Sequence, residues 1–180
     1  PPTDEDQCLF DDSDIRVLKE SGSLPTGAVI RPYDPKVKAD FCSSTWVCFF
    51  LYPFSIGLSY PFPPLIQRFF DVTGFSYSQV MPMVWRVLLT LDRLNKTHGL
   101  SIDIPEIAAG YNLRTHGSFR YCLQSKSSRL YMVPKVSLSD RDWKKRFFFV
   151  RRDSIPNGEE LPVQWVKKGR MFVGLVVSLA

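Results

Sequence analysis

The chain has 180 residues, of which 44% are hydrophobic and 14% aromatic, and its formal net charge is +5. This length and composition fit one globular domain with a sizeable core, and they exclude a disordered chain or two full domains. The charge is unevenly placed, because residues 1–20 are mainly acidic and residues 111–180 are mainly basic. The asymmetry favours a polyanionic partner for the C-terminal part, although basic residues also protect a solvated sheet edge from aggregation.

Residues 1–40 are expected to form an acidic arm that is interrupted by prolines and glycines. One short helix is predicted inside this arm, from Ser13 to Glu20, with Ser13 as its N-terminal cap. The single globular domain is expected to span residues 41–170, and residues 171–180 form an apolar tail. Because the chain begins with Pro1 and stops inside this apolar tail, we expect it to be part of a longer polypeptide.

Within the globular domain, an amphipathic helix is predicted from Pro63 to Val72, with proline in its first turn and Gly74 as its stop. Its apolar residues share one face: Leu65, Ile66, Phe69 and Phe70.

The strongest helical pattern runs from Gln79 to Thr97, with Ser78 as the cap and Gly99 as the stop. Trp85 lies beside the apolar stripe of this helix, so we expect it to anchor the core rather than bind a ligand. A further short helix is predicted from Pro105 to Ala109.

From Tyr111 onward the apolar pattern changes to that of strands. Ser118–Leu123 and Arg129–Val133 are predicted to form a hairpin, Trp143–Arg151 a further strand, and Val163–Val166 a fourth. Three phenylalanines and a valine stand together at residues 147–150, which predicts a strand that is covered on both faces. Helices followed by strands predict an α+β fold, with a helical N-terminal half packed on a small, mainly antiparallel C-terminal sheet.

The cysteines and histidines show no spacing typical of a zinc site: Cys8, Cys42, Cys48, Cys122, His98 and His116. Without a signal peptide, reduced thiols and an intracellular location are expected, in the nucleus or the cytoplasm, with Cys48 and Cys122 buried as small hydrophobic residues. The most apolar stretch, residues 46–58, is interrupted by Pro53 and is too short to cross a bilayer, so no membrane partner is expected.

Catalytic motifs are absent from the sequence, including the nucleophile elbow, the zinc-protease helix and the phosphate-binding loops. His98 falls at a predicted helix end and His116 in a polar loop, so neither is expected to act as a general base. We therefore predict a protein that is not an enzyme and that needs no cofactor and no metal.

The alternative is a transposase-like phosphoryl-transfer enzyme in which clustered carboxylates hold metal ions. The carboxylates to consider are Asp71, Asp92, Asp103, Asp140 and Asp142. Convergence of any three of them would favour this alternative.

Basic residues surround and follow the apolar run at residues 147–150, and they are the candidate nucleic-acid ligands. They are Arg141, Lys144, Lys145, Arg146, Arg151, Arg152, Lys167, Lys168 and Arg170. Tyr121, Tyr131 and Trp143 could stack on bases, but aromatic residues of a small sheet usually pack in the core. Charge reversal at Lys144, Lys145, Arg146, Arg151 and Arg152 is expected to abolish nucleic-acid binding without unfolding the domain.

Three motifs in this order resemble the plant gypsy-type transposon domain: Phe54-x-Ile-Gly-Leu-x-Tyr-Pro-Phe-Pro-Pro, Gln79-x-x-Pro-x-x-Trp-Arg and Trp143-Lys-x-Arg-Phe-Phe-Phe-Val. The resemblance covers about residues 41–166. It implies a retrotransposon-derived domain near the gag-like portion of an element, in a family without established catalytic residues, and it assigns no site residue here. The chain lacks the Cys-Cys-His-Cys zinc knuckle common in gag proteins, which argues against RNA packaging by this segment.

These observations together predict a non-enzymatic, retrotransposon-derived domain for protein association or assembly. Its expected partners are another copy of itself or other element-encoded proteins, with DNA or RNA bound non-specifically through the basic C-terminal part.

Overall fold

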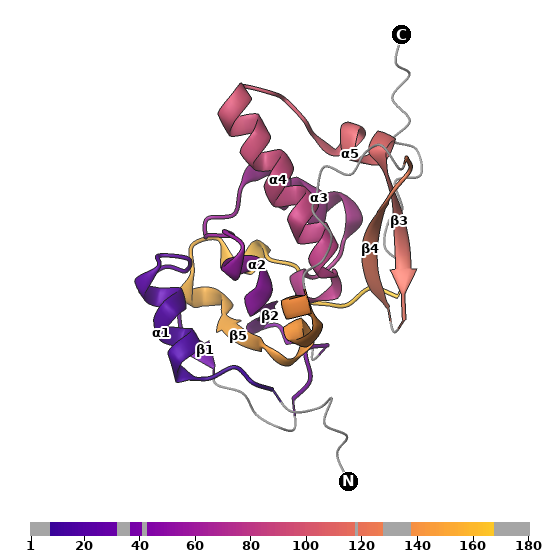
Figure 1. Cartoon of the computed structure of the whole chain (residues 1–180). Coiled ribbons are helices and arrows are strands. Elements are labelled where there is room, and N and C mark those ends of the chain that lie inside the picture. The colour runs from indigo at the N-terminus through magenta and orange to yellow at the C-terminus, as the bar shows by residue number, and fades with distance from the viewer. Residues whose placement is uncertain (1–7, 32–36, 41–42, 118, 128–137, 168–180) are drawn as a thin grey trace.

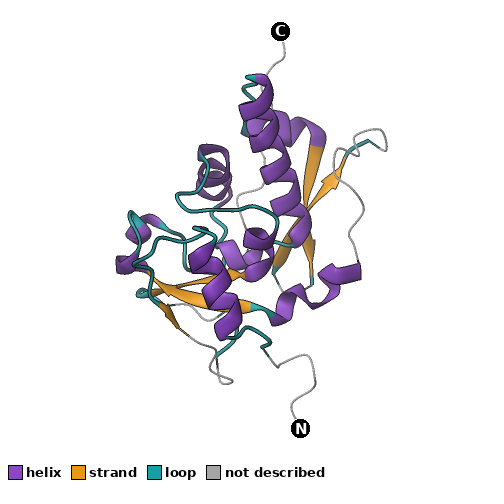
Figure 2. Ribbon diagram, turned by 60° about the vertical axis from the view of Figure 1, so that its left-hand side comes forward, coloured by secondary structure: helices purple, strands orange, loops and turns teal. Residues whose placement is uncertain are grey.

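The computed structural model describes residues 8–31, 37–40, 43–117, 119–127 and 138–167. In these ranges the fold is α+β, with helices mostly in the N-terminal half and two small antiparallel sheets (Figures 1 and 2). The helices are α1 Asp12–Glu20, α2 Leu51–Ser55, α3 Pro64–Thr73, α4 Pro82–His98 and α5 Ile104–Gly110. The strands are β1 Ile30–Arg31, β2 Trp46–Phe50, β3 Tyr111–His116, β4 Arg120–Ser125 and β5 Phe147–Arg151. No helix in the described ranges combines the length and hydrophobicity needed to cross a membrane.

Strand β5 is the centre of a three-stranded antiparallel sheet, between β1 and β2. Phe148 and Val150 face the main core, whereas Phe147 and Phe149 pack in a second cluster with residues that include Phe50. The prediction of a strand covered on both faces is therefore confirmed. The strand is shorter than predicted, because Trp143 belongs to a preceding 3-10 helix, Leu138–Lys145.

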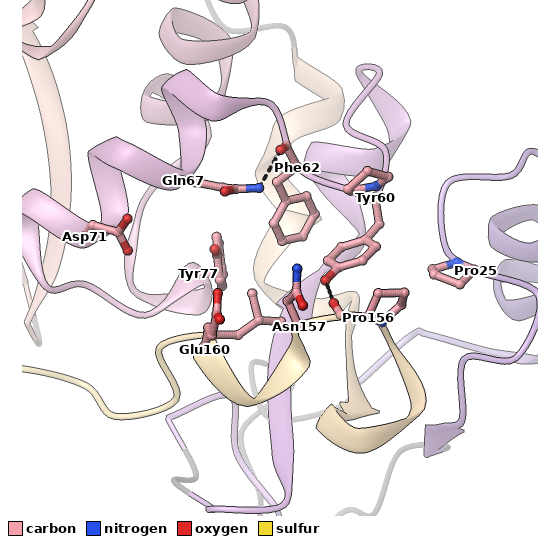
Figure 3. Close-up of a pocket in the computed structure, with 11 residues that line it drawn as sticks. Pro25, Tyr60, Phe62, Gln67, Asp71, Tyr77, Pro156, Asn157 and Glu160 are labelled. Atoms are coloured by element: carbon pink, nitrogen blue, oxygen red, sulfur yellow. Dashed lines mark hydrogen bonds between the residues drawn. The ribbon is translucent and has the colours of Figure 1, made fainter.

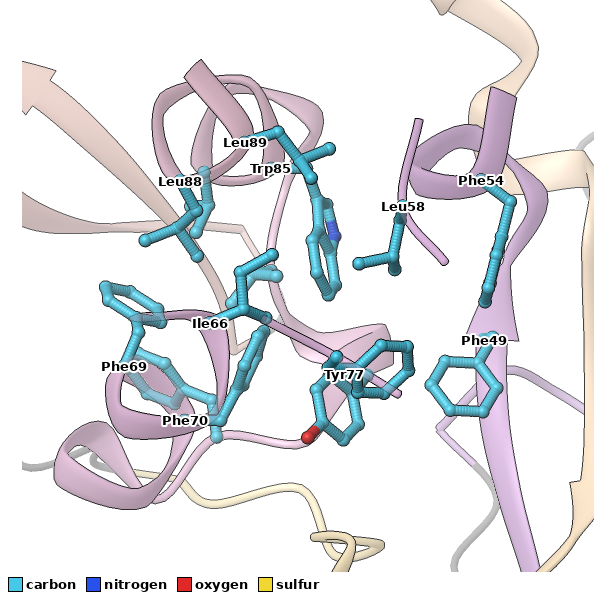
Figure 4. Close-up of a cluster of buried hydrophobic side chains, with 14 of the residues drawn as sticks. Phe49, Phe54, Leu58, Ile66, Phe69, Phe70, Tyr77, Trp85, Leu88 and Leu89 are labelled. Carbon is cyan, nitrogen blue, oxygen red and sulfur yellow. The ribbon is translucent and has the colours of Figure 1, made fainter. Parts of the chain in front are cut away.

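The main core is a network of aromatic rings between this sheet and helices α3 and α4 (Figure 4). Trp85 is 2% exposed, and its ring lies 5.2 Å from that of Phe70 and 6.1 Å from that of Tyr77. Trp85 is thus a core anchor, as predicted. Each fully buried ring of this size contributes about 1.5–3 kcal/mol relative to an exposed one, so this network holds the two halves of the fold together.

Both long helices end at glycine, as predicted, since Gly74 and Gly99 take the left-handed conformation with φ of 72° and 62°. Helix α4, however, begins at Pro82 rather than Gln79. Proline has no backbone N–H and holds the preceding residue extended, and Met81 accordingly has φ −82° and ψ 161°. Ser78 is therefore not a helix cap but part of a separate 3-10 turn, Tyr77–Gln79.

The described part of the expected N-terminal arm belongs to the core. Phe10, Leu18 and Leu24 are buried, and strand β1 pairs with β5. Helix α1 is capped by Asp11 instead of Ser13, because the Asp11 carboxylate accepts hydrogen bonds from the backbone of the first turn. Hydrogen bonding by Ser13, followed by the backbone N–H of Asp14, holds the pKa of Asp11 below its ordinary value.

The second sheet is a hairpin of β3 and β4, in which Leu113 lies opposite Leu123. It lies beside α4, on the other side of the molecule from the three-stranded sheet (Figure 1). The strand predicted at Ser118–Leu123 is present as β4, with bounds two residues later. Strand β3 was not predicted, because polar residues hide its alternation. The range 129–133, which was expected to pair there, lies outside the described residues.

The predicted strand Val163–Val166 is wrong: this segment has no regular structure. The side chain of Gln79 takes the place of a neighbouring strand. Its amide donates to the Val166 carbonyl at 2.6 Å and accepts from the Val166 N–H at 3.1 Å, so these backbone groups are satisfied without a sheet.

Candidate functional site

The candidate nucleic-acid ligands on either side of the apolar run at residues 147–150 stand at opposite ends of β5. Lys144, Lys145 and Arg146 precede the strand, and Arg151 and Arg152 end and follow it. A strand of this length separates the two groups by roughly 15 Å, at about 3.3 Å per residue. The five residues consequently form two charged groups rather than one continuous patch.

Arg152 acts inside the protein. Its side chain is only 12% exposed and donates hydrogen bonds to the carbonyls of Ser44 at 2.7 Å, Gly158 at 2.9 Å and Glu159. It also lies 3.6 Å from the Glu159 carboxylate. The guanidinium therefore joins the segment before β2 to the loop after β5, and this role uses most of its donors.

Three further candidates are paired with acidic side chains. Arg146 binds both carboxylate oxygens of Asp14 in α1, at 3.0 and 3.3 Å, and so fixes α1 to the start of β5. The other two pairs are local: Arg151 with Asp153 at 2.6 Å and Lys145 with Asp142 at 3.3 Å. Partly exposed pairs of this kind are worth little, so a phosphate could compete for Lys145 and Arg151 more easily than for Arg152.

Lys144 and Lys167 are exposed and form no ion pair within the described part of the chain. The side chain of Arg141, and the whole of Lys168 and Arg170, lie outside the described residues. Among the candidates that the structure describes, Lys144 and Lys167 are therefore best able to contact a phosphate.

Arg120 of β4 lies against two tryptophans from distant segments. Its guanidinium carbon lies 5.2 Å from the ring centre of Trp143 and 5.1 Å from that of Trp165. Burial lowers the pKa of Arg120, and its Nη1 is buried without a hydrogen bond to the described residues. The stacked arginine holds the segments of both tryptophans against β4. Lys144 directly follows Trp143, and Lys167 lies two residues after Trp165.

The aromatic residues considered for base stacking serve the core instead. Tyr121 is 1% exposed and stacks on Phe75 with ring centres 4.0 Å apart. Trp143 contacts Phe50 at 4.7 Å between ring centres as well as Arg120. Tyr131 lies outside the described residues. Sequence could not identify Arg120 as the centre of this packing, because its neighbours come from three distant segments.

The carboxylates of the alternative enzyme hypothesis do not gather into a metal site within the described ranges. Asp92 pairs with Lys96 at 2.7 Å, and Asp103 pairs with Arg68 at 2.8 Å at the start of α5. Asp142 pairs with Lys145, and the side chain of Asp140 lies outside the described part.

A pocket of about 200 Å³ was not predicted at all (Figure 3). It forms where the loop before α3, helix α3, the 3-10 turn at Tyr77 and the loop after β5 meet. Its lining residues are aromatic, acidic, amide or apolar: Pro25, Tyr60, Pro61, Phe62, Gln67, Asp71, Tyr77, Pro156, Asn157, Glu160 and Leu161. Part of the first motif, Tyr60-Pro-Phe, supplies one wall, but nothing in the sequence places Glu160 beside it.

The polar groups of this pocket are held in defined positions. The Gln67 amide donates to the Phe62 carbonyl at 2.7 Å, and the Tyr60 hydroxyl donates to the Pro156 carbonyl (Figure 3). Burial, followed by the neighbouring Glu160, raises the pKa of Tyr60. Burial and the neighbouring Asp71 likewise raise the pKa of Tyr77, so both phenols remain neutral at physiological pH.

No protein-family model, no curated protein and no solved structure matches the chain.

Proposed function

We propose that the protein is a non-enzymatic association domain, derived from a plant gypsy-type retrotransposon, that binds a polypeptide partner through the pocket between Tyr60, Asp71, Tyr77 and Glu160. The pocket is the observation that carries this proposal. It combines aromatic walls with a few fixed polar groups, which is the composition typical of recognition sites. The resemblance in three motifs supports the origin, and the first of these motifs contributes Tyr60 and Phe62 to the pocket.

Selection from a random peptide library displayed on phage tests this function. The folded domain should enrich related peptides, and the double variant Asp71→Asn/Glu160→Gln should not. The control is Asp12→Asn/Glu20→Gln, which removes the same charge from exposed positions of α1. Peptides enriched equally by the native domain and both variants, or no enrichment by the native domain, would contradict the proposal.

A second function, weak nucleic-acid binding without sequence preference, is favoured by the exposed lysines Lys144 and Lys167. Neither lysine forms an ion pair within the described part of the chain, so each can contact a phosphate, and the affinity should fall as the salt concentration rises. The partners on this hypothesis are single- or double-stranded DNA or RNA.

Fluorescence anisotropy with labelled single- and double-stranded DNA and RNA at two salt concentrations tests the second function. Lys144→Glu/Lys167→Glu should weaken binding more than Arg16→Glu/Lys38→Glu, which makes the same change in net charge at exposed N-terminal positions. If both double variants lost the same affinity, net charge alone would explain the effect, and the two lysines would not form a binding site. No binding even at low salt would remove this function.

A further inference from the structure

The charged side chains of the pocket are all acidic. Asp71 and Glu160 line it, no lysine, arginine or histidine does, and the chain as a whole carries a net charge of +5. Neither carboxylate forms an ion pair or hydrogen bond with any residue in the described ranges, whereas acids such as Asp14, Asp92 and Asp103 are paired. The pocket therefore offers two uncompensated negative charges to a ligand.

Tyr77 supplies the independent observation that points to a ligand. The residue is 3% exposed and lines the pocket, yet its hydroxyl forms no hydrogen bond within the described part of the chain. The hydroxyl oxygen is not fully enclosed by the described residues, so it opens into the pocket and offers an unused hydrogen-bond donor and acceptor there. A bound N–H donor would satisfy the hydroxyl oxygen, and the hydroxyl proton could in turn bind a carboxylate.

The remaining lining groups add acceptors and aromatic surfaces. Because the Gln67 amide nitrogen is bound to the Phe62 carbonyl, its carbonyl oxygen is left as an acceptor. The rings of Tyr60 and Phe62 meet edge to face at 5.0 Å between centres, and Phe62 and Tyr77 are also 5.0 Å apart. A cation can therefore contact ring surfaces while its N–H groups bind oxygen atoms.

A guanidinium group fits these features better than an ammonium group. It is planar, stacks on aromatic rings and has five N–H donors in a fixed arrangement, whereas an ammonium has three donors and keeps a strong hydration shell. Acceptors from three separate segments surround the pocket: Gln67 and Asp71 on α3, Tyr77 in the 3-10 turn, and Glu160 after β5, with Asn157 beside it. A volume of about 200 Å³ suits one such group with the adjoining part of its stem.

We propose that the pocket binds an arginine side chain of the polypeptide partner, with Asp71 and Glu160 as its counter-ions and the Tyr77 hydroxyl as a hydrogen-bond partner. This inference rests on the proposed association function and names the chemistry of the partner. Tyr60 and Phe62 provide the aromatic walls, and their fixed positions reduce the entropy lost on binding.

Titration of the ¹⁵N-labelled domain with N-acetyl-arginine methylamide, followed by NMR, tests the proposal. The side-chain amide signals of Gln67 and Asn157 should shift as the ligand is added and reach a plateau when the pocket is saturated. The citrulline analogue has nearly the same shape without the charge and should bind about tenfold or more weakly, since one charge-assisted contact is worth at least this factor. The lysine analogue should also bind more weakly, because it cannot span the separated acceptors.

Tyr77→Phe and Glu160→Gln should each weaken arginine binding while the remaining spectrum stays that of the folded domain. Glu20→Gln is the matched control and should change nothing. Equal binding of the arginine and citrulline analogues, or shifts that avoid the pocket, would overturn the proposal. If the phage selection yields pocket-dependent peptides without arginine, the association function stands and this inference fails; if it yields none, the association function itself fails.

Discussion

Replacement of Arg152 by methionine should destabilise the domain strongly, although the sequence alone places this residue among surface ligands. Arg152→Met keeps most of the aliphatic stem and removes the donors to the carbonyls of Ser44, Gly158 and Glu159. Losing a hydrogen bond to a charged group costs about 1.5–3 kcal/mol, but the full cost applies only when the remaining partner cannot bind water instead. Ser44 and Glu159 are exposed and can bind water, whereas Gly158 is buried.

Arg152→Met should therefore lower the free energy of unfolding by about 2–4 kcal/mol. This corresponds to the full value of the bond to Gly158 and part of the value of the bonds to Ser44 and Glu159. The Glu159 carboxylate is 71% exposed and 3.6 Å away, so its ion pair adds less than about 1 kcal/mol. Urea unfolding followed by tryptophan fluorescence measures the change.

Lys144→Met is the matched control, because it removes the same charge from an exposed side chain and should cost less than about 0.5 kcal/mol. A decrease of less than about 0.5 kcal/mol in the free energy of unfolding of Arg152→Met would refute the structural role of Arg152. For Lys144 we still predict that charge reversal leaves the fold intact. We now expect charge reversal to destabilise the fold at Arg152, and at Arg146 because it breaks the bond to Asp14.

Three further predictions concern the same framework. Gly158→Ala should cost at least about 2 kcal/mol, because an added Cβ would lie 1.9 Å from the Arg152 carbonyl oxygen, and an unchanged urea midpoint would contradict this packing. Phe148→Ala should cost about 3–5 kcal/mol because the ring is fully buried, whereas Val17→Ala at an exposed position of α1 should be nearly neutral; similar urea midpoints for the two variants would show that β5 is not the core strand. Burial raises the pKa of the Cys48 thiol and the Tyr77 hydroxyl above their ordinary values of 9.0 and 10.0, so the unfolded chain loses these protons first. The stability that these groups contribute is fully present below pH 9 and is lost as the pH rises above that value. The urea midpoint should therefore be lower at about pH 10.5 than at about pH 8. An equal or higher midpoint at the higher pH would contradict this prediction.

The helical half of the fold could be predicted because its signals are local. The apolar face of α3 and the stops at Gly74 and Gly99 depend on residues a few positions apart, and the structure has all of them. The three-stranded sheet was predictable only at β5. Its partners β1 and β2 lie about 100 residues or more away in the chain, and no local pattern indicates which strands will pair.

The candidate site was less predictable for the same reason. A basic residue beside an apolar run has the same sequence signature whether it binds a phosphate or a distant part of its own chain. Arg146 meets Asp14 across 132 positions, and Arg152 meets Ser44 across 108. The pocket depends on even more separate segments, since Tyr60 and Pro156 are 96 positions apart.

The three motifs that carry the resemblance meet in one place, which limits what the resemblance can say about function. Phe54 of the first motif and Phe148 of the third have ring centres 5.7 Å apart, and Trp85 of the second lies in the same core cluster. Such residues determine the fold. Asp71 and Glu160 belong to none of the motifs, so a protein could keep all three motifs and lose both carboxylates. On our proposal, such a protein would retain this fold but lose the arginine site. Whether a protein with these motifs shares the function is therefore indicated by the two carboxylates and not by the motifs.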